Sequence, residues 1–171
     1  MNSNSVGEVK ASISDEKLLD VQYGDNPPDV TNQYTFTLKD ANGTTVGTVK
    51  SGASGATVDF PEITYSTPGT YTYTVTESGS LDGVTNDDTA TKTVSVVVSD
   101  NTDGTMSATV NGGNGAVIFT NTYNAASVDV PIPVNKTLSV LSGNNAPNVE
   151  GQYTFTLKDA NTTTVSTVTS G

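Results

Sequence analysis

Three polar residues interrupt apolar stripes in the strands that the sequence predicts. Side chains alternate between the two faces of a β-strand, so every second residue shares a face. Lys17, Glu77 and Asn121 each continue an alternating apolar series, and these series are residues 9–21, 71–77 and 117–123. Burying such groups without partners costs several kcal/mol, so we expect the fold to bring them together.

An amine, a carboxyl group and an amide in a dry core can react with one another. Burial lowers the pKa of a lysine and raises that of a carboxyl group. A neutral Lys17 is a nucleophile, and a protonated Glu77 could donate to the carbonyl oxygen of Asn121 and then shuttle protons. Attack of Nζ on Cγ, with loss of ammonia, would leave an isopeptide bond. The reaction would occur once per molecule.

Other readings of these residues stay open. Lys17 alone could be a lysine at a strand edge that extends to water. Asp15, if it points inward, would favour a charged and unreactive Lys17. Lys10 is a second candidate amine, but its phase predicts that it faces solvent. Asn111 and Asn114 are further candidate amides, but they lie in a glycine-rich segment that favours a turn.

Composition excludes several classes of function. The 171 residues include no His and no Cys, which excludes a Ser-His-Asp triad, a cysteine nucleophile and a zinc site of the usual kinds. All seven basic residues are Lys, the net charge is −11, and there is no basic patch. This charge argues against nucleic acid and anionic membranes as partners, and no run is long enough for a membrane span. We expect no cofactor and no metal.

The chain contains an internal repeat. The segment QYTFTLKDAN at 33–42 recurs unchanged at 152–161, 119 positions later, and seven of the next ten positions also match. The same offset aligns Lys17 with Lys136 and Asp15 with Val134. The predicted domains are a complete one at 1–124 and the N-terminal part of a second, truncated repeat at 125–171. Lys136 would then be a crosslinking lysine without a partner in this chain.

Alternating Thr, Val and Tyr residues predict strands throughout the first repeat. The predicted strands are residues 33–39, 45–49, 57–60, 69–77, 89–98, 104–110 and 116–123, besides the early strand that carries Lys17. In the second repeat, alternation over 128–140 predicts another strand around Lys136. Many short strands separated by turns predict an all-β fold, an antiparallel Ig-like β-sandwich.

Three motifs hold these residues: an early-strand lysine before TFTLKD, the segment PGTYTYTVTE that ends on Glu77, and IFTNTY, which holds Asn121. Together they resemble the intramolecular isopeptide domain of Gram-positive backbone pilins of the streptococcal T-antigen type. The resemblance implies that Lys17 bonds to Asn121 with Glu77 as the acid and base. It covers residues 6–124 and the first third of the same pattern in 125–171.

The resemblance also implies a function. The chain would be a structural stalk module of a bacterial pilus or adhesin, secreted and displayed on the cell wall or pilus surface. Its partners would be neighbouring repeats or pilin subunits in a fibre. The alternative is an adhesive module that binds a host glycan or matrix protein, although the chain has no Trp and no Arg. The sequence does not predict a multiple-turnover enzyme.

Overall fold

The computed structural model describes residues 7–111 and 116–171. The chain divides into two compact units, Met1–Ala126 and Ser127–Gly171. The described residues contain no helix long and apolar enough to cross a membrane.

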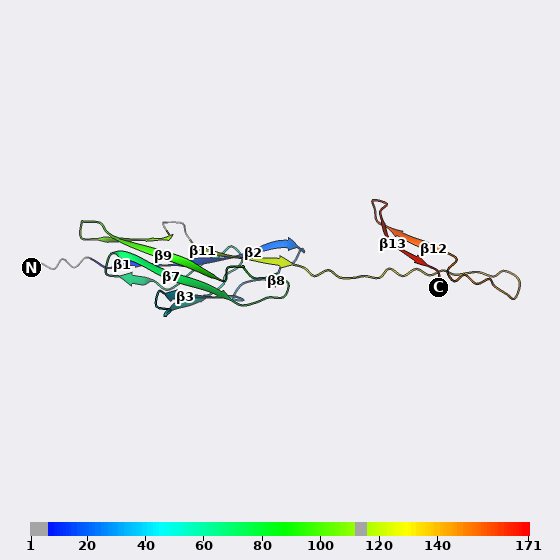
Figure 1. Cartoon of the computed structure of the whole chain (residues 1–171), viewed down its shortest axis with the longest axis horizontal. Coiled ribbons are helices and arrows are strands. Elements are labelled where there is room, and N and C mark those ends of the chain that lie inside the picture. The colour runs from blue at the N-terminus through cyan, green and yellow to red at the C-terminus, as the bar shows by residue number, and fades with distance from the viewer. Residues whose placement is uncertain (1–6, 112–115) are drawn as a thin grey trace, which may run out of the picture. The chain divides into compact units, whose positions relative to one another are not determined.

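The first unit is built from two main sheets (Figure 1). The five-stranded sheet has the order β10 (Met106–Val110), β9 (Thr91–Asp100), β7 (Gly69–Ser78), β3 (Thr35–Asp40), β4 (Thr45–Lys50). The four-stranded sheet has the order β5 (Thr57–Asp59), β2 (Ser14–Tyr23), β11 (Val117–Asn124), β8 (Val84–Thr85). Two short strands, β1 (Val9–Ala11) and β6 (Ile63–Tyr65), pair with each other. The predicted all-β sandwich is confirmed.

The pairing of β2 with β11 is parallel, whereas every other described pair is antiparallel. Lys17 lies opposite Phe119 and Leu19 lies opposite Asn121 in this register. The strands come from the two ends of the unit in sequence, and Figure 1 shows blue β2 beside the yellow-green β11. The first and last long strands of the unit are therefore direct neighbours.

The alternation in the sequence matches the observed faces. In β3, Phe36 and Leu38 are fully buried, whereas Thr35 and Thr37 are only partly buried. The core between the sheets also takes in Tyr34, Val75 and Phe119, and the rings of Phe36 and Phe119 lie 5.3 Å apart. Apolar burial of this kind is the main force that holds two sheets together.

Some predicted strands differ from the observed ones. The strand predicted at 89–98 runs from Thr91 to Asp100, which leaves residues 86–90 as a loop. Strands β6 and β8 were not predicted because two or three residues are too few to show an alternating pattern.

The second unit contains one hairpin, β12 (Thr154–Lys158) and β13 (Thr164–Thr169). It copies the β3–β4 hairpin 119 positions earlier, together with the backbone hydrogen bonds that close it. Ser51 N–H donates to Tyr34 O at 3.0 Å, and Ser170 N–H donates to Tyr153 O at 2.8 Å.

The strand predicted over 128–140 is not present. Its counterpart β2 is held by β5 and β11, and residues 127–171 contain no counterpart of either strand. Pro131 and Pro133 also lack the N–H groups of a sheet ladder. An alternating sequence does not form a strand without neighbours to accept its hydrogen bonds.

Candidate crosslinking site

Strands of both main sheets bring Lys17, Glu77 and Asn121 together. Lys17 on β2 and Asn121 on β11 belong to adjacent strands of the four-stranded sheet. Glu77 lies on β7 of the five-stranded sheet, opposite Phe36 of β3. Each side chain takes a core-facing position in its strand, so the three meet between the sheets. Residues far apart in sequence thus form one cluster.

Glu77 connects the other two residues through its two carboxyl oxygens. Lys17 Nζ donates to Oε2 at 2.7 Å, and Asn121 Nδ2 donates to Oε1 at 3.0 Å. Lys17 Nζ also donates a long hydrogen bond of 3.5 Å to Phe119 O. The carboxyl group therefore touches both the amine and the amide nitrogen that would leave as ammonia.

The orientation of the amide differs from the expected one. Glu77 was expected to donate to the carbonyl oxygen of Asn121, but it faces the amide nitrogen. The oxygen Oδ1 instead accepts from the backbone N–H of Asp87 at 2.7 Å. Because a backbone N–H can only donate, this contact fixes which end of the amide is oxygen.

The site is dry. Lys17 and Asn121 are 1% and 0% exposed, and Glu77 is 7% exposed. Burial lowers the pKa of Lys17, and its hydrogen bond and ion pair with Glu77 oppose part of that shift. Lys17 therefore loses its proton more easily than a lysine in water does, and the neutral amine is the nucleophilic form.

Asp15 points inward, on the same face of β2 as Lys17, and is fully buried. Neither of its carboxyl oxygens has a hydrogen-bond partner among the described residues. Burial and the charge of Glu77 raise its pKa to about 7, although Lys17 opposes the shift. A protonated Asp15 leaves one ammonium and one carboxylate in the site, which balance each other.

Tyr34 is a further neighbour of Lys17 that sequence reasoning missed. Lys17 Nζ lies 4.7 Å from the centre of its ring. Burial raises the pKa of its hydroxyl group, so the phenol beside Lys17 Nζ stays neutral. The repeat offered a signal for this role, because the 119-residue offset pairs Tyr34 with Tyr153 as it pairs Lys17 with Lys136.

The loop between β8 and β9 also contacts Asn121, and sequence reasoning missed it. Asn86 Oδ1 accepts from Asn121 Nδ2 at 3.2 Å, and Asn86 Nδ2 donates to Gly79 O at 2.9 Å. The sequence Asn86-Asp87-Asp88 indicates a turn, but nothing in it indicates contact with a strand more than thirty residues away.

The competing candidates lie elsewhere. Lys10 is exposed and forms a 3.5 Å ion pair with Glu62. Asn111 accepts from Ser95 N–H through Oδ1. Asn114 lies outside the described residues.

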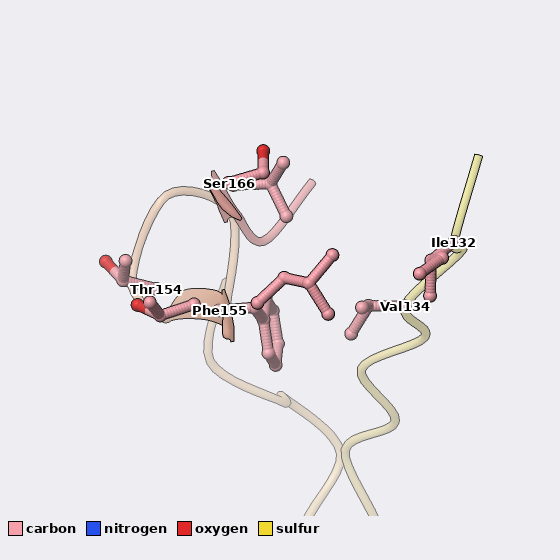
Figure 2. A pocket seen from close by; sticks show the side chains of 8 residues that line it. Ile132, Val134, Thr154, Phe155 and Ser166 are labelled. Carbon is pink, nitrogen blue, oxygen red and sulfur yellow. The ribbon is translucent and has the colours of Figure 1, made fainter. Parts of the chain in front are cut away.

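In the second unit, Lys136 repeats one contact of the site. Its Nζ lies 4.4 Å from the centre of the Tyr153 ring, as Lys17 lies over Tyr34. An apolar pocket lies beside the hairpin, and Figure 2 shows Ile132 and Val134 on a segment opposite Phe155. Within residues 127–171 no carboxylate or amide contacts Lys136 Nζ. The second unit therefore has the lysine and the tyrosine without the other groups.

No group of three or more acidic side chains in the described residues could hold a metal ion. Comparison with curated proteins gives no significant match. Residues 13–124 match the family described as FctA, the Spy0128-like isopeptide containing domain. This match spans most of the chain and all three residues of the cluster. The chain belongs to this family of pilin-type isopeptide domains.

Proposed function

We propose that Lys17 and Asn121 form an intramolecular isopeptide bond, with Glu77 as the acid and base. The observation that carries this proposal is the bridging position of Glu77, which touches Lys17 Nζ and Asn121 Nδ2 with different oxygens in a buried site. Close contact and exclusion of water supply most of what such a reaction needs.

The geometry favours a short proton path. Oε2 of Glu77 takes a proton from Lys17, and the neutral Nζ attacks Cγ of Asn121. Oε1 then delivers this proton to Nδ2, the Cγ–Nδ2 bond breaks, and the second Nζ proton passes through Glu77 to the departing ammonia, which leaves as ammonium. The Nζ–Cγ bond forms before the Cγ–Nδ2 bond breaks, and the C=O electron pair lies on Oδ1 between the two steps. Glu77 ends as it began, and no cofactor takes part.

We further propose that residues 1–124 are one complete domain and that 125–171 are the N-terminal part of a second domain of the same type. The copied hairpin and the Lys136–Tyr153 contact support this repeat. Lys136 would bond only if Glu and Asn counterparts came from further strands.

The family membership and the position of the bond support a role as a stalk module of a pilus or adhesin on the bacterial surface. The bond would join the first and last long strands of the domain, which are parallel neighbours. Subunits or repeats of the same kind would be its partners in a fibre.

Intact mass measurement tests the bond. We expect the chain to be lighter than its sequence by one ammonia. Glu77→Ala should restore the full mass, because it removes the proton carrier. Lys10→Ala and Lys136→Ala are matched controls that keep the mass deficit, since neither lysine contacts Glu77. A full mass for the unsubstituted chain would overturn the proposal.

A further inference from the structure

Among the described residues, one hydrogen-bond donor contacts the carbonyl oxygen of Asn121. Asp87 N–H donates to Oδ1 at 2.7 Å. If Nζ attacks Cγ, the electron pair of the C=O bond moves to Oδ1, which becomes negatively charged. A donor already aimed at that oxygen would stabilise the charge without rearranging during the reaction.

The side chain of Asp87 holds its own backbone in this place. Oδ1 of Asp87 accepts from Thr89 N–H at 2.8 Å, which fixes the turn. Oδ2 accepts from Thr120 N–H at 2.9 Å, on the strand residue that precedes Asn121. Lys92 forms an ion pair with the same oxygen at 2.8 Å. One carboxylate thus ties the loop to β11 next to the reacting amide.

This arrangement does not depend on pH over the ordinary range. Burial alone would raise the pKa of Asp87, but hydrogen bonds from Lys92, Thr120 and Thr89 outweigh it and lower the pKa to about 2. The group is therefore ionised at neutral pH and accepts all three hydrogen bonds there. Lys92 Nζ also donates to Ile118 O at 2.7 Å, which adds a second tie between the β9 end of the loop and β11.

We propose that the backbone N–H of Asp87 is the oxyanion donor for the Lys17–Asn121 reaction, and that the Asp87 carboxylate is the positioning group that holds it there. The inference rests on the proposed isopeptide bond. Glu77 moves the protons, and Asp87 stabilises the charge on Oδ1 until ammonia leaves and the C=O bond of the new amide re-forms. Each residue contacts a different atom of the Asn121 amide group, so their contributions are separable.

The test follows crosslinking over time in the full chain. The protein is made in a reconstituted translation system, samples are quenched in acid, and intact mass gives the fraction that has lost ammonia. The decisive substitution replaces the Asp87 amide by an ester, which deletes N–H and keeps the side chain. We expect crosslinking to slow on the order of 100-fold, as for loss of one oxyanion donor. The same ester at the exposed neighbour Asp88 is the matched control and should leave the rate unchanged.

Side-chain variants test the positioning role. Asp87→Ala should slow crosslinking at least about 10-fold, and Asp87→Asn, which keeps one acceptor oxygen, should recover part of that loss. Lys92→Met removes the ion pair and the Ile118 hydrogen bond but keeps the Thr89 and Thr120 hydrogen bonds that hold the Asp87 backbone, so it should slow the reaction less than Asp87→Ala does. If Asp87→Ala and Lys92→Met slow the reaction equally, the carboxylate acts only through stability and the positioning role is wrong.

The outcomes distinguish the role of Asp87 from the proposed isopeptide bond on which it depends. An unsubstituted chain that keeps its full mass would overturn the bond and the donor together. An unsubstituted chain that loses ammonia, with an Asp87 ester that reacts as fast, would overturn the donor alone. If Asp87→Ala fails to fold, which amide hydrogen exchange would show, the ester decides.

Discussion

At the scale of single residues, Asp15 is the group that the fold accommodates least well. It is buried without hydrogen-bond partners, next to a lysine that must lose its charge to react. The second repeat has Val134 at the matching position, so an apolar residue is compatible with this type of strand. Asp15 therefore decreases the stability of the first unit whenever it is ionised.

We predict that Asp15→Val stabilises the protein, and more so at high pH. The folded pKa of Asp15 is about 7 against 3.8 for an unperturbed carboxyl group, so the folded state binds the proton more tightly. Stability falls as pH rises through this window, and the full penalty is present above it. The shift corresponds to roughly 4 kcal/mol.

Urea unfolding of both proteins at about pH 8 and about pH 4 measures this effect. The advantage of the valine variant should be largest at the higher pH and shrink towards the lower one. Asp25→Asn, at an exposed position, is the control and should show no such trend. An advantage that does not change with pH would contradict a raised pKa for Asp15.

At the scale of elements, the site depends on the connections of β7. Gly79 follows this strand with a φ of 129°. A Cβ there would lie 2.7 Å from Gln33 O and 3.1 Å from Tyr34 Cδ1. Gly79 therefore lies close to Tyr34, whose ring contacts Lys17, and Gly79 O also accepts the hydrogen bond from Asn86.

We predict that Gly79→Ala destabilises the domain by about 2–3 kcal/mol, because it adds a backbone clash to the cost of a positive φ. Gly43→Ala is the matched control. Gly43 also has a positive φ, of 80°, but nothing lies within 4 Å of its added Cβ. It should lose only about 1 kcal/mol. Denaturant midpoints compare the two variants in a Glu77→Ala background, which lacks the bond. Equal losses of stability in the two variants would show that contact with Gln33 and Tyr34 is unimportant.

At the scale of the whole molecule, the parallel arrangement of β2 and β11 decides how the first unit would carry tension. Force entering near Lys17 and leaving near Asn121 would pull along the new bond. Residues 18–120 would lie outside the loaded path, so the hydrogen bonds between their strands would not have to resist it.

We predict that the first unit does not unfold when it is pulled from its two ends in a single-molecule experiment. In the Lys17→Ala variant the unit should unfold and the chain should lengthen on the order of 30 nm, because the residues between positions 17 and 121 become part of the stretched chain. Lys136→Ala should behave like the unsubstituted chain in this unit. Full lengthening of the unsubstituted first unit would contradict a bond that carries the applied force.

The sequence by itself determined the strand faces and the inward direction of Lys17, Glu77 and Asn121. It could do so because alternation can be read along a single strand. A polar residue at a position where the alternation calls for an apolar one stands out even when the partner strands are unknown. The repeat also marked Lys136 as the copy of Lys17. The fold class followed from the number and spacing of short strands.

Only the tertiary structure decided which groups meet and in what orientation. The parallel register of β2 and β11 and the contact of Asp87 with Asn121 both join segments whose pairing no local pattern encodes. The absent strand around Lys136 shows the same limit, because a strand forms only where partner strands accept its hydrogen bonds. Local phase determined what points into the core, and long-range pairing determined what those side chains touch there.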